Sequence, residues 1–202
     1  MMGKTHITIG MASALALTAV NTPAGIAVAL AGGALGGVMP DVDTLRNDYK
    51  HDAMFGELLA VSVVASAAVM DYFLKWGICA DVLANQQSAI LGAVLMLALW
   101  IFGLTREHRT FTHSILSMAL FSLAAAFIYV PFGVSFMIGY LSHLLLDILN
   151  KKGILLLYPM KNEICLNLCY AGKLANTIFM IFGYIATISL TIFRVLTLHG
   201  VI

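Results

Sequence analysis

Seven apolar runs, separated by short polar segments, constrain this chain more than any other feature. Hydrophobic residues make up 61% of the sequence and charged residues only 10%, whereas soluble domains average roughly 45–50% and 25%. The runs therefore predict membrane-spanning helices. We expect a single all-α integral membrane domain over residues 1–202, a bundle of about seven helices. The predicted spans are 7–20, 24–39, 57–76, 88–105, 114–130, 134–150 and 174–198.

Two details qualify the predicted spans. The first run begins at Ile7 and is interpreted as a helix that the mature protein keeps, because no small-residue cleavage site leads into a soluble domain. Some of the runs, the first and the sixth among them, are shorter than the roughly 20 residues that cross a full hydrocarbon core. The second run carries Gly32, Gly33, Gly36 and Gly37, a spacing of small residues that predicts close packing of helices in lipid.

Basic residues indicate how the bundle is oriented. Following the helical hairpins along the chain places nine of them at one end: Lys4, Arg46, Lys50, Arg106, Arg109, Lys151, Lys152, Lys161 and Lys173. Only Lys75 and Arg194 fall at the other end. Loops rich in lysine and arginine stay in the cytoplasm, so we expect a multi-pass membrane protein whose lysine-rich end faces the cytoplasm. The net charge of +1 and the lack of a basic tail argue against nucleic acid as a partner.

Histidines and aspartates recur at the cytoplasmic ends of four predicted helices. They are His6, Asp41 and Asp43, His108 and His113, and His143 and Asp147. His143 and Asp147 are four residues apart, which places them on one face of a helix. Ionisable groups at membrane depth are costly and mark functional sites. A mixed set of imidazoles and carboxylates suits zinc, manganese or iron, and seven candidate ligands are enough for one or two ions.

The remaining polar residues and the cysteines have other predicted roles. Arg109 is predicted either to bind a phosphate or carboxylate in a two-pronged contact or to anchor the chain to lipid headgroups. His51 is expected to be solvated, and His199 lies at the far end of the last helix. Ser114 is predicted to cap a helix. The three cysteines, Cys79, Cys165 and Cys169, indicate no disulfide framework. Cys165 and Cys169 are expected to pack rather than bind metal.

Four ordered motifs resemble one family. Thr5-His6, Pro40-Asp41-Val42-Asp43, the string from His108 to Ser114, and Ser142-His143 with Asp147 resemble the YdjM-like bacterial inner-membrane proteins, described as metal-dependent hydrolases. The resemblance covers about residues 1–160, and the tail from Leu174 contributes nothing to it. It implies metal-site roles for His6, Asp41, Asp43, His108, His113, His143 and Asp147, with Arg109 as their companion. Thr110 departs from the pattern, since glycine is frequent there in the family.

These observations lead to a functional hypothesis. We expect a membrane-embedded, metal-dependent hydrolase, a phosphoesterase that acts on a membrane lipid or lipid-linked substrate through metal-activated water. Asp41, Asp43 or His108 would serve as the general base if it is not a ligand. The alternatives are a metal or ion transporter and a membrane protein with a structural metal site. The sequence does not predict an oligomeric state.

Overall fold

The computed structural model describes residues 2–46, 50–170 and 173–201, so Asp48 of the first polar loop lies outside the described residues. Within these ranges the chain forms eight α-helices, two 3-10 helices and no strand. The helices are α1 Gly3–Leu17, α2 Pro23–Val38, η1 Met39–Arg46, α3 Lys50–Leu74, α4 Ile78–Ala84, α5 Gln86–Leu104, η2 Phe111–His113, α6 Ile115–Ile128, α7 Val130–Ile148 and α8 Leu174–Leu198. The all-α prediction is confirmed.

Each of the seven predicted spans corresponds to a helix, and an additional helix, α4, lies between the third and the fourth predicted spans. Among the described residues, five segments are long and apolar enough to cross a membrane: Pro23–Thr44, Met54–Leu74, Gln86–Leu104, Val130–Ile148 and Leu174–Leu198. Helices α1 and α6 have 15 and 14 residues and are shorter than a full span.

The turn between α6 and α7 differs from the prediction. A turn was expected at Pro131–Gly133, but α6 ends at Ile128 and α7 begins at Val130, so that Tyr129 alone joins them. Pro131 lies in the first turn of α7. Its missing N–H removes no hydrogen bond there, because the first N–H groups of a helix have no partner within the helix.

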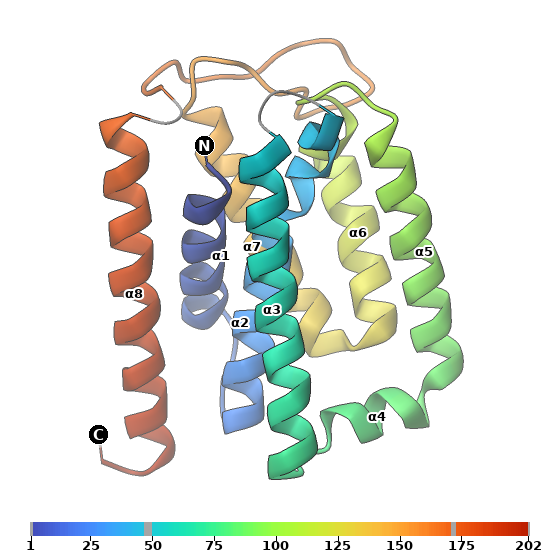
Figure 1. Cartoon of the computed structure of the whole chain (residues 1–202), viewed down its shortest axis with the longest axis vertical. Coiled ribbons are helices and arrows are strands. Elements are labelled where there is room, and N and C mark those ends of the chain that lie inside the picture. Colours follow the sequence, from blue (N-terminus) through green and yellow to red (C-terminus); the bar gives the residue numbers. More distant parts are fainter. Residues whose placement is uncertain (1, 47–49, 171–172, 202) are drawn as a thin grey trace.

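Helices α1, α2 and α7 form the centre of the bundle, and α3, α5 and α8 stand around it (Figure 1). The side chains of α2 are mostly buried. The outer helices expose large apolar side chains, such as Phe73 at 73% and Leu174 at 74%. Exposed apolar faces of this size are typical of helices that face lipid.

Glycines allow the central helices to approach one another closely, as the sequence predicts. A Cβ atom at Gly33 would lie 2.6 Å from the carbonyl oxygen of Gly10 in α1. A Cβ atom at Gly36 would overlap the carbonyl of Phe136 in α7. Any larger side chain at these positions would therefore push α2 away from both neighbours.

Helix α8 is attached to α1 by a row of polar contacts. Asn176 Oδ1 accepts a hydrogen bond from Thr5 Oγ1 at 2.9 Å, and Thr187 Oγ1 donates to the carbonyl of Thr8 at 3.1 Å. Near the other end, Arg194 donates to carbonyl oxygens at the end of α1. These contacts hold an otherwise lipid-exposed helix in one register against α1.

The segment from 149 to 170 covers one end of the bundle, near the N-terminus and opposite the C-terminus (Figure 1). Ile154 and Ile164 exchange backbone hydrogen bonds within it. Leu155 N donates to Arg109 O at 3.0 Å, and Ile115 N donates to Leu156 O at 3.0 Å. The segment is therefore fixed to the loops that lie between α5 and α6.

Candidate metal centre

The seven predicted ligands lie together under this covered end of the bundle. His6 is in the first turns of α1, Asp41 and Asp43 are in η1, His108 follows α5, His113 ends η2, and His143 and Asp147 are in the last turns of α7. Four helices and the loop after α5 therefore supply one cluster. Six of the seven residues are buried, and His108 is partly exposed.

Four side-chain atoms of the cluster lie close to one another. His113 Nε2 lies 3.3 Å from His143 Nε2 and 3.5 Å from Asp147 Oδ2. Asp41 Oδ1 lies 3.6 Å from His113 Nε2 and 3.7 Å from His143 Nε2. A tetrahedral ion with bonds of about 2.1 Å keeps its ligand atoms about 3.4 Å apart. The four measured separations are thus those expected between neighbouring ligands of one metal ion.

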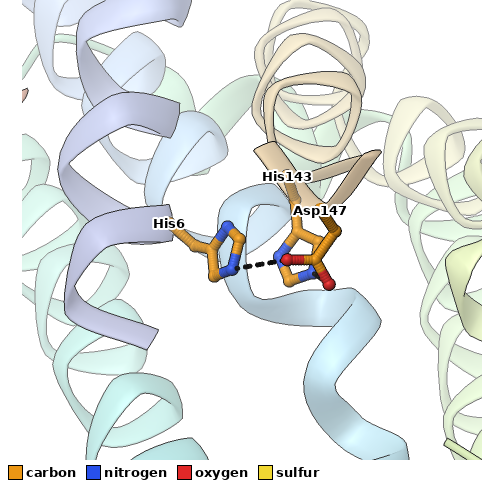
Figure 2. Close-up of side chains that lie close together, drawn as sticks. All are labelled: His6, His143 and Asp147. Carbon is orange, nitrogen blue, oxygen red and sulfur yellow. Dashed lines mark ion pairs between the residues drawn. The ribbon is translucent and has the colours of Figure 1, made fainter. Parts of the chain in front are cut away.

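His6 extends the cluster on the side of α1. Its ring stacks on that of His143, with centroids 3.6 Å apart and planes inclined by 18°. Its Nε2 faces Asp147 Oδ1 at 3.6 Å (Figure 2). Neither ring nitrogen of His6 has a hydrogen-bond partner among the described residues. A buried polar group without a partner is destabilising. A metal ion bound to a ring nitrogen of His6 would remove this cost.

The residues divide into two sets of three whose ligand atoms lie within 4.8 Å of one another: His6, His143 and Asp147, and Asp41, His108 and His113. The sets meet where His113 contacts His143. Zinc sites with three protein ligands keep a fourth position for water and are catalytic, whereas four protein ligands close a structural site. The cluster fits either one ion held by four protein ligands or two adjacent ions that each have three protein ligands and one open position.

Hydrogen bonds fix which nitrogen of each central imidazole faces the cluster. His143 Nδ1 lies 2.7 Å from the carbonyl oxygen of Gly37, which can only accept, so the proton is on Nδ1. His113 Nδ1 lies 3.4 Å from Asp43 Oδ2 and 3.1 Å from Thr112 Oγ1. Both Nε2 atoms are then free to bind a metal, and such outer hydrogen bonds are typical of metal-bound histidines.

Asp43 lies behind the histidines. Its Oδ1 contacts His108 Nδ1 at 2.7 Å. Its Oδ2 accepts hydrogen bonds from Arg109 N at 3.1 Å and from Thr112 Oγ1 at 2.5 Å. Because both oxygens are already engaged, the geometry favours Asp43 as the residue that orients the imidazoles, rather than as a ligand or general base.

Arg109 points into the site. Its Nη2 lies 3.2 Å from Asp147 Oδ2, its Nη1 donates to the carbonyl of Lys152 at 2.5 Å, and its side chain is only 13% exposed. The residue has a positive φ of 71°, which non-glycine residues rarely adopt. The guanidinium therefore contacts both Asp147 and the covering segment.

The electrostatics of the cluster favour a cation. Burial alone would lower the pKa of His113, but Asp43, Asp147 and Asp41 raise it well above its usual value. Three buried carboxylates thus stabilise positive charge at this point, whether it is carried by a proton or by a metal ion.

Access to the cluster is uneven. The side chains of His6, His113 and His143 are fully buried and that of Asp147 is 2% exposed, whereas Asp41 is 12% and His108 26% exposed. Asp41 and His108 are thus the most accessible members of the cluster.

Two polar residues near the site were missed in the sequence. Glu57, half-buried at the start of the second long apolar run, interacts electrostatically with Asp41. Asn176 is 3% exposed and accepts hydrogen bonds from Met2 N and Thr5 Oγ1, one residue from His6. Each is a single polar residue at the end of an apolar run, and this position is the sequence feature that could have identified it. His51 is exposed and His199 ends α8, as expected.

A family model described as YdjM inner membrane protein matches residues 1–200. The chain belongs to this family. Membership of the YdjM family identifies an inner membrane protein, and the apolar helices agree with it. The match extends past residue 160 and includes α8, so the expectation that the tail from Leu174 lies outside the resemblance was wrong. No curated protein and no solved structure matches the chain.

Proposed function

We propose that this YdjM-family protein is a metal-dependent hydrolase in the membrane, a phosphoesterase that acts on a lipid or lipid-linked phosphoester. The observation that carries the proposal is the pair of three-residue sets. Six ligands exceed the four that one tetrahedral ion takes, and each set leaves one position of an ion open. Zinc fits the mixture of imidazoles and carboxylates best, with manganese or iron as alternatives.

A divalent ion bound here would lower the pKa of water and stabilise charge on a phosphoryl oxygen. The chain's own residues supply orientation. Asp43 and the Gly37 carbonyl hold three imidazoles, and Arg109 holds Asp147. Because the ligands come from separate helices held by close glycine packing, they are arranged before any substrate binds.

The position of the cluster supports a substrate with a phosphate headgroup. It lies at one end of the bundle, at the level where headgroups would meet the helix ends, and the more accessible ligands are Asp41 and His108. Lys4, Arg106, Lys151, Lys152, Lys161 and Lys173 lie at the same end. By the positive-inside rule this end faces the cytoplasm, so the substrate belongs to the cytoplasmic leaflet.

The packing below the cluster argues against transport. Transporters hold their sites near the midplane between helices that separate. Here α2 contacts α1 and α7 through Gly33 and Gly36 with no room for a Cβ atom, directly below the cluster. A structural site is the stronger alternative, because a single closed ion would use four of the ligands.

Hydrolysis by the purified, zinc-loaded protein tests the proposal. Phosphatidic acid and phosphatidylglycerol in detergent micelles serve as probes, and released phosphate or glycerophosphate is measured. We expect turnover in the wild type, loss of at least about a hundredfold in His108→Ala, and full activity in His199→Ala. A zinc-loaded wild type that hydrolyses neither of these lipids nor a soluble phosphodiester would contradict the proposal.

A further inference from the structure

A cavity lies on the other side of α1 from the metal cluster. It is a groove of about 330 Å³ between α1, α3 and α8, within the size range of small-molecule sites, about 300–1,000 Å³. Its walls include Lys4, Ile7 and Met11 of α1, Val63 and Ser66 of α3, and Tyr184 of α8. Figure 1 shows α3 and α8 on either side of α1, so the groove opens toward the lipid.

The groove offers few free hydrogen-bonding groups, because its two serine hydroxyls are already hydrogen-bonded. The hydroxyl of Ser66 donates to the carbonyl of Ser62 at 2.8 Å, and that of Ser62 donates to the carbonyl of Leu58 at 2.7 Å. Both donors are thus used within α3. Water in such a groove would have few partners, whereas an acyl chain would contact the apolar walls.

A single positive charge lies at one end of the groove. Lys4 is half-buried, at the start of α1, and its Nζ lies 4.7 Å from the centre of the Phe55 ring. This is the end of the bundle where the other lysines gather, at the level of the headgroups. Basic residues between membrane helices at this depth bind anionic lipid headgroups.

The groove is separate from the metal cluster. Lys4, Ile7 and Met11 are spaced by three and four residues and share one face of α1. His6 follows Lys4 by two residues, about 200° around the helix, and contacts α7 instead. The groove is therefore a site of its own and no entrance for the hydrolysed substrate.

We propose that this groove binds one acyl chain of an anionic phospholipid whose phosphate pairs with Lys4. The combination of one cation at the headgroup level and an apolar channel below it matches the chemistry of phosphatidylglycerol. The bound lipid fills the space beside α1, whose 15 residues are too few to span the hydrocarbon core, and it supports the helix that carries His6.

Native mass spectrometry of the detergent-solubilised full chain tests this inference, with equal amounts of phosphatidylglycerol and phosphatidylcholine added. Ser66→Phe fills the groove from an exposed position, and Ala68→Phe places the same ring on the opposite, exposed face of α3. We expect one retained phosphatidylglycerol in the wild type and in Ala68→Phe, and none in Ser66→Phe. Equal lipid retention in the two phenylalanine variants would overturn the proposal.

Headgroup selectivity provides the second readout. Lys4→Gln should reduce the preference for phosphatidylglycerol about fivefold, the effect of about one lysine at a membrane surface. Lys75→Gln is the matched control, because Lys75 also lies over an aromatic ring, that of Tyr72, but at the other end of the bundle and outside the groove. An unchanged preference in Lys4→Gln would show that the phosphate does not pair with this lysine.

Discussion

His143 donates its Nδ1 proton to the carbonyl oxygen of Gly37 at 2.7 Å, and this hydrogen bond joins α7 to α2. The same glycine lies against the backbone of His6, because a Cβ atom at position 37 would be 2.6 Å from the His6 carbonyl oxygen. Gly37 thus sets the orientation of one imidazole and the distance of another. The close packing of the three central helices therefore sets the geometry of the candidate metal centre.

Gly37→Ala should separate α1 from α2 and weaken the cluster. The added methyl group cannot be accommodated without a backbone shift, and overpacking of this kind typically costs about 1–3 kcal/mol. Thermal unfolding in detergent should show a lower midpoint, and zinc binding should fall. Gly56→Ala is the control, because the nearest atom to its Cβ would be 3.4 Å away. An unaltered midpoint in Gly37→Ala would disprove the account of this contact.

Asp43→Asn distinguishes an orienting carboxylate from a ligand. If Asp43 only orients His108 and His113, the amide should reduce zinc affinity by about 10–100-fold and leave the number of bound ions unchanged. Asp147→Asn should remove one of the two ions, because Asp147 belongs to one set of ligands. Isothermal titration with zinc separates the two results, with Asp81→Asn at the far end as a control. A reduced stoichiometry in Asp43→Asn would make Asp43 a ligand.

Substitutions of Arg109 separate its side-chain role from its backbone role. Arg109→Ala loses the ion pair with Asp147 and keeps the unfavourable positive φ. Arg109→Gly loses the same ion pair but adopts that φ readily, so it should be more stable than the alanine variant by about 1 kcal/mol. Both should bind zinc more weakly than the wild type. Equal unfolding midpoints for the two variants would exclude backbone strain at this position.

The natural cysteines report the orientation of the bundle. Cys79 is exposed in α4 at the end opposite the cluster, and Cys165 is exposed in the covering segment. An impermeant maleimide should label Cys79, but not Cys165, in cells whose outer membrane alone has been made permeable. The hydrogen bond with Asp71 raises the pKa of Cys79, so less thiolate is present and labelling should become faster as the pH rises. Labelling of Cys165 alone would reverse the orientation.

The sequence predicted the helices well, because apolar runs and glycine spacing are local signals. It also placed the seven candidate ligands at helix ends that the structure brings together. The sequence did not distinguish the roles of these ligands. Asp41 and Asp43 are equivalent in the Asp-Val-Asp motif, and only the folded chain shows that Asp43 lies behind the histidines. The contact between Asn176 and Thr5 depends on how α8 docks on α1, which no local pattern encodes.

The orientation of the Arg109 side chain also could not be predicted from the sequence. Its position between two histidines allowed a contact with substrate or with lipid headgroups, whereas the structure turns its side chain onto Asp147. That direction is set by the positive φ of the residue and by the covering segment, whose Lys152 carbonyl accepts the second hydrogen bond. Both depend on tertiary packing.

The metal content of the purified protein tests the central claim most directly. Elemental analysis after zinc loading should find about two ions per chain, one for each set of three ligands. His143→Ala and Asp147→Ala, which both change the set that contains His6, should lose one of the two ions, and His199→Ala should keep both. One ion per chain would contradict the open, catalytic arrangement and favour a closed structural site. No bound zinc, manganese or iron in the wild type would contradict the metal centre itself.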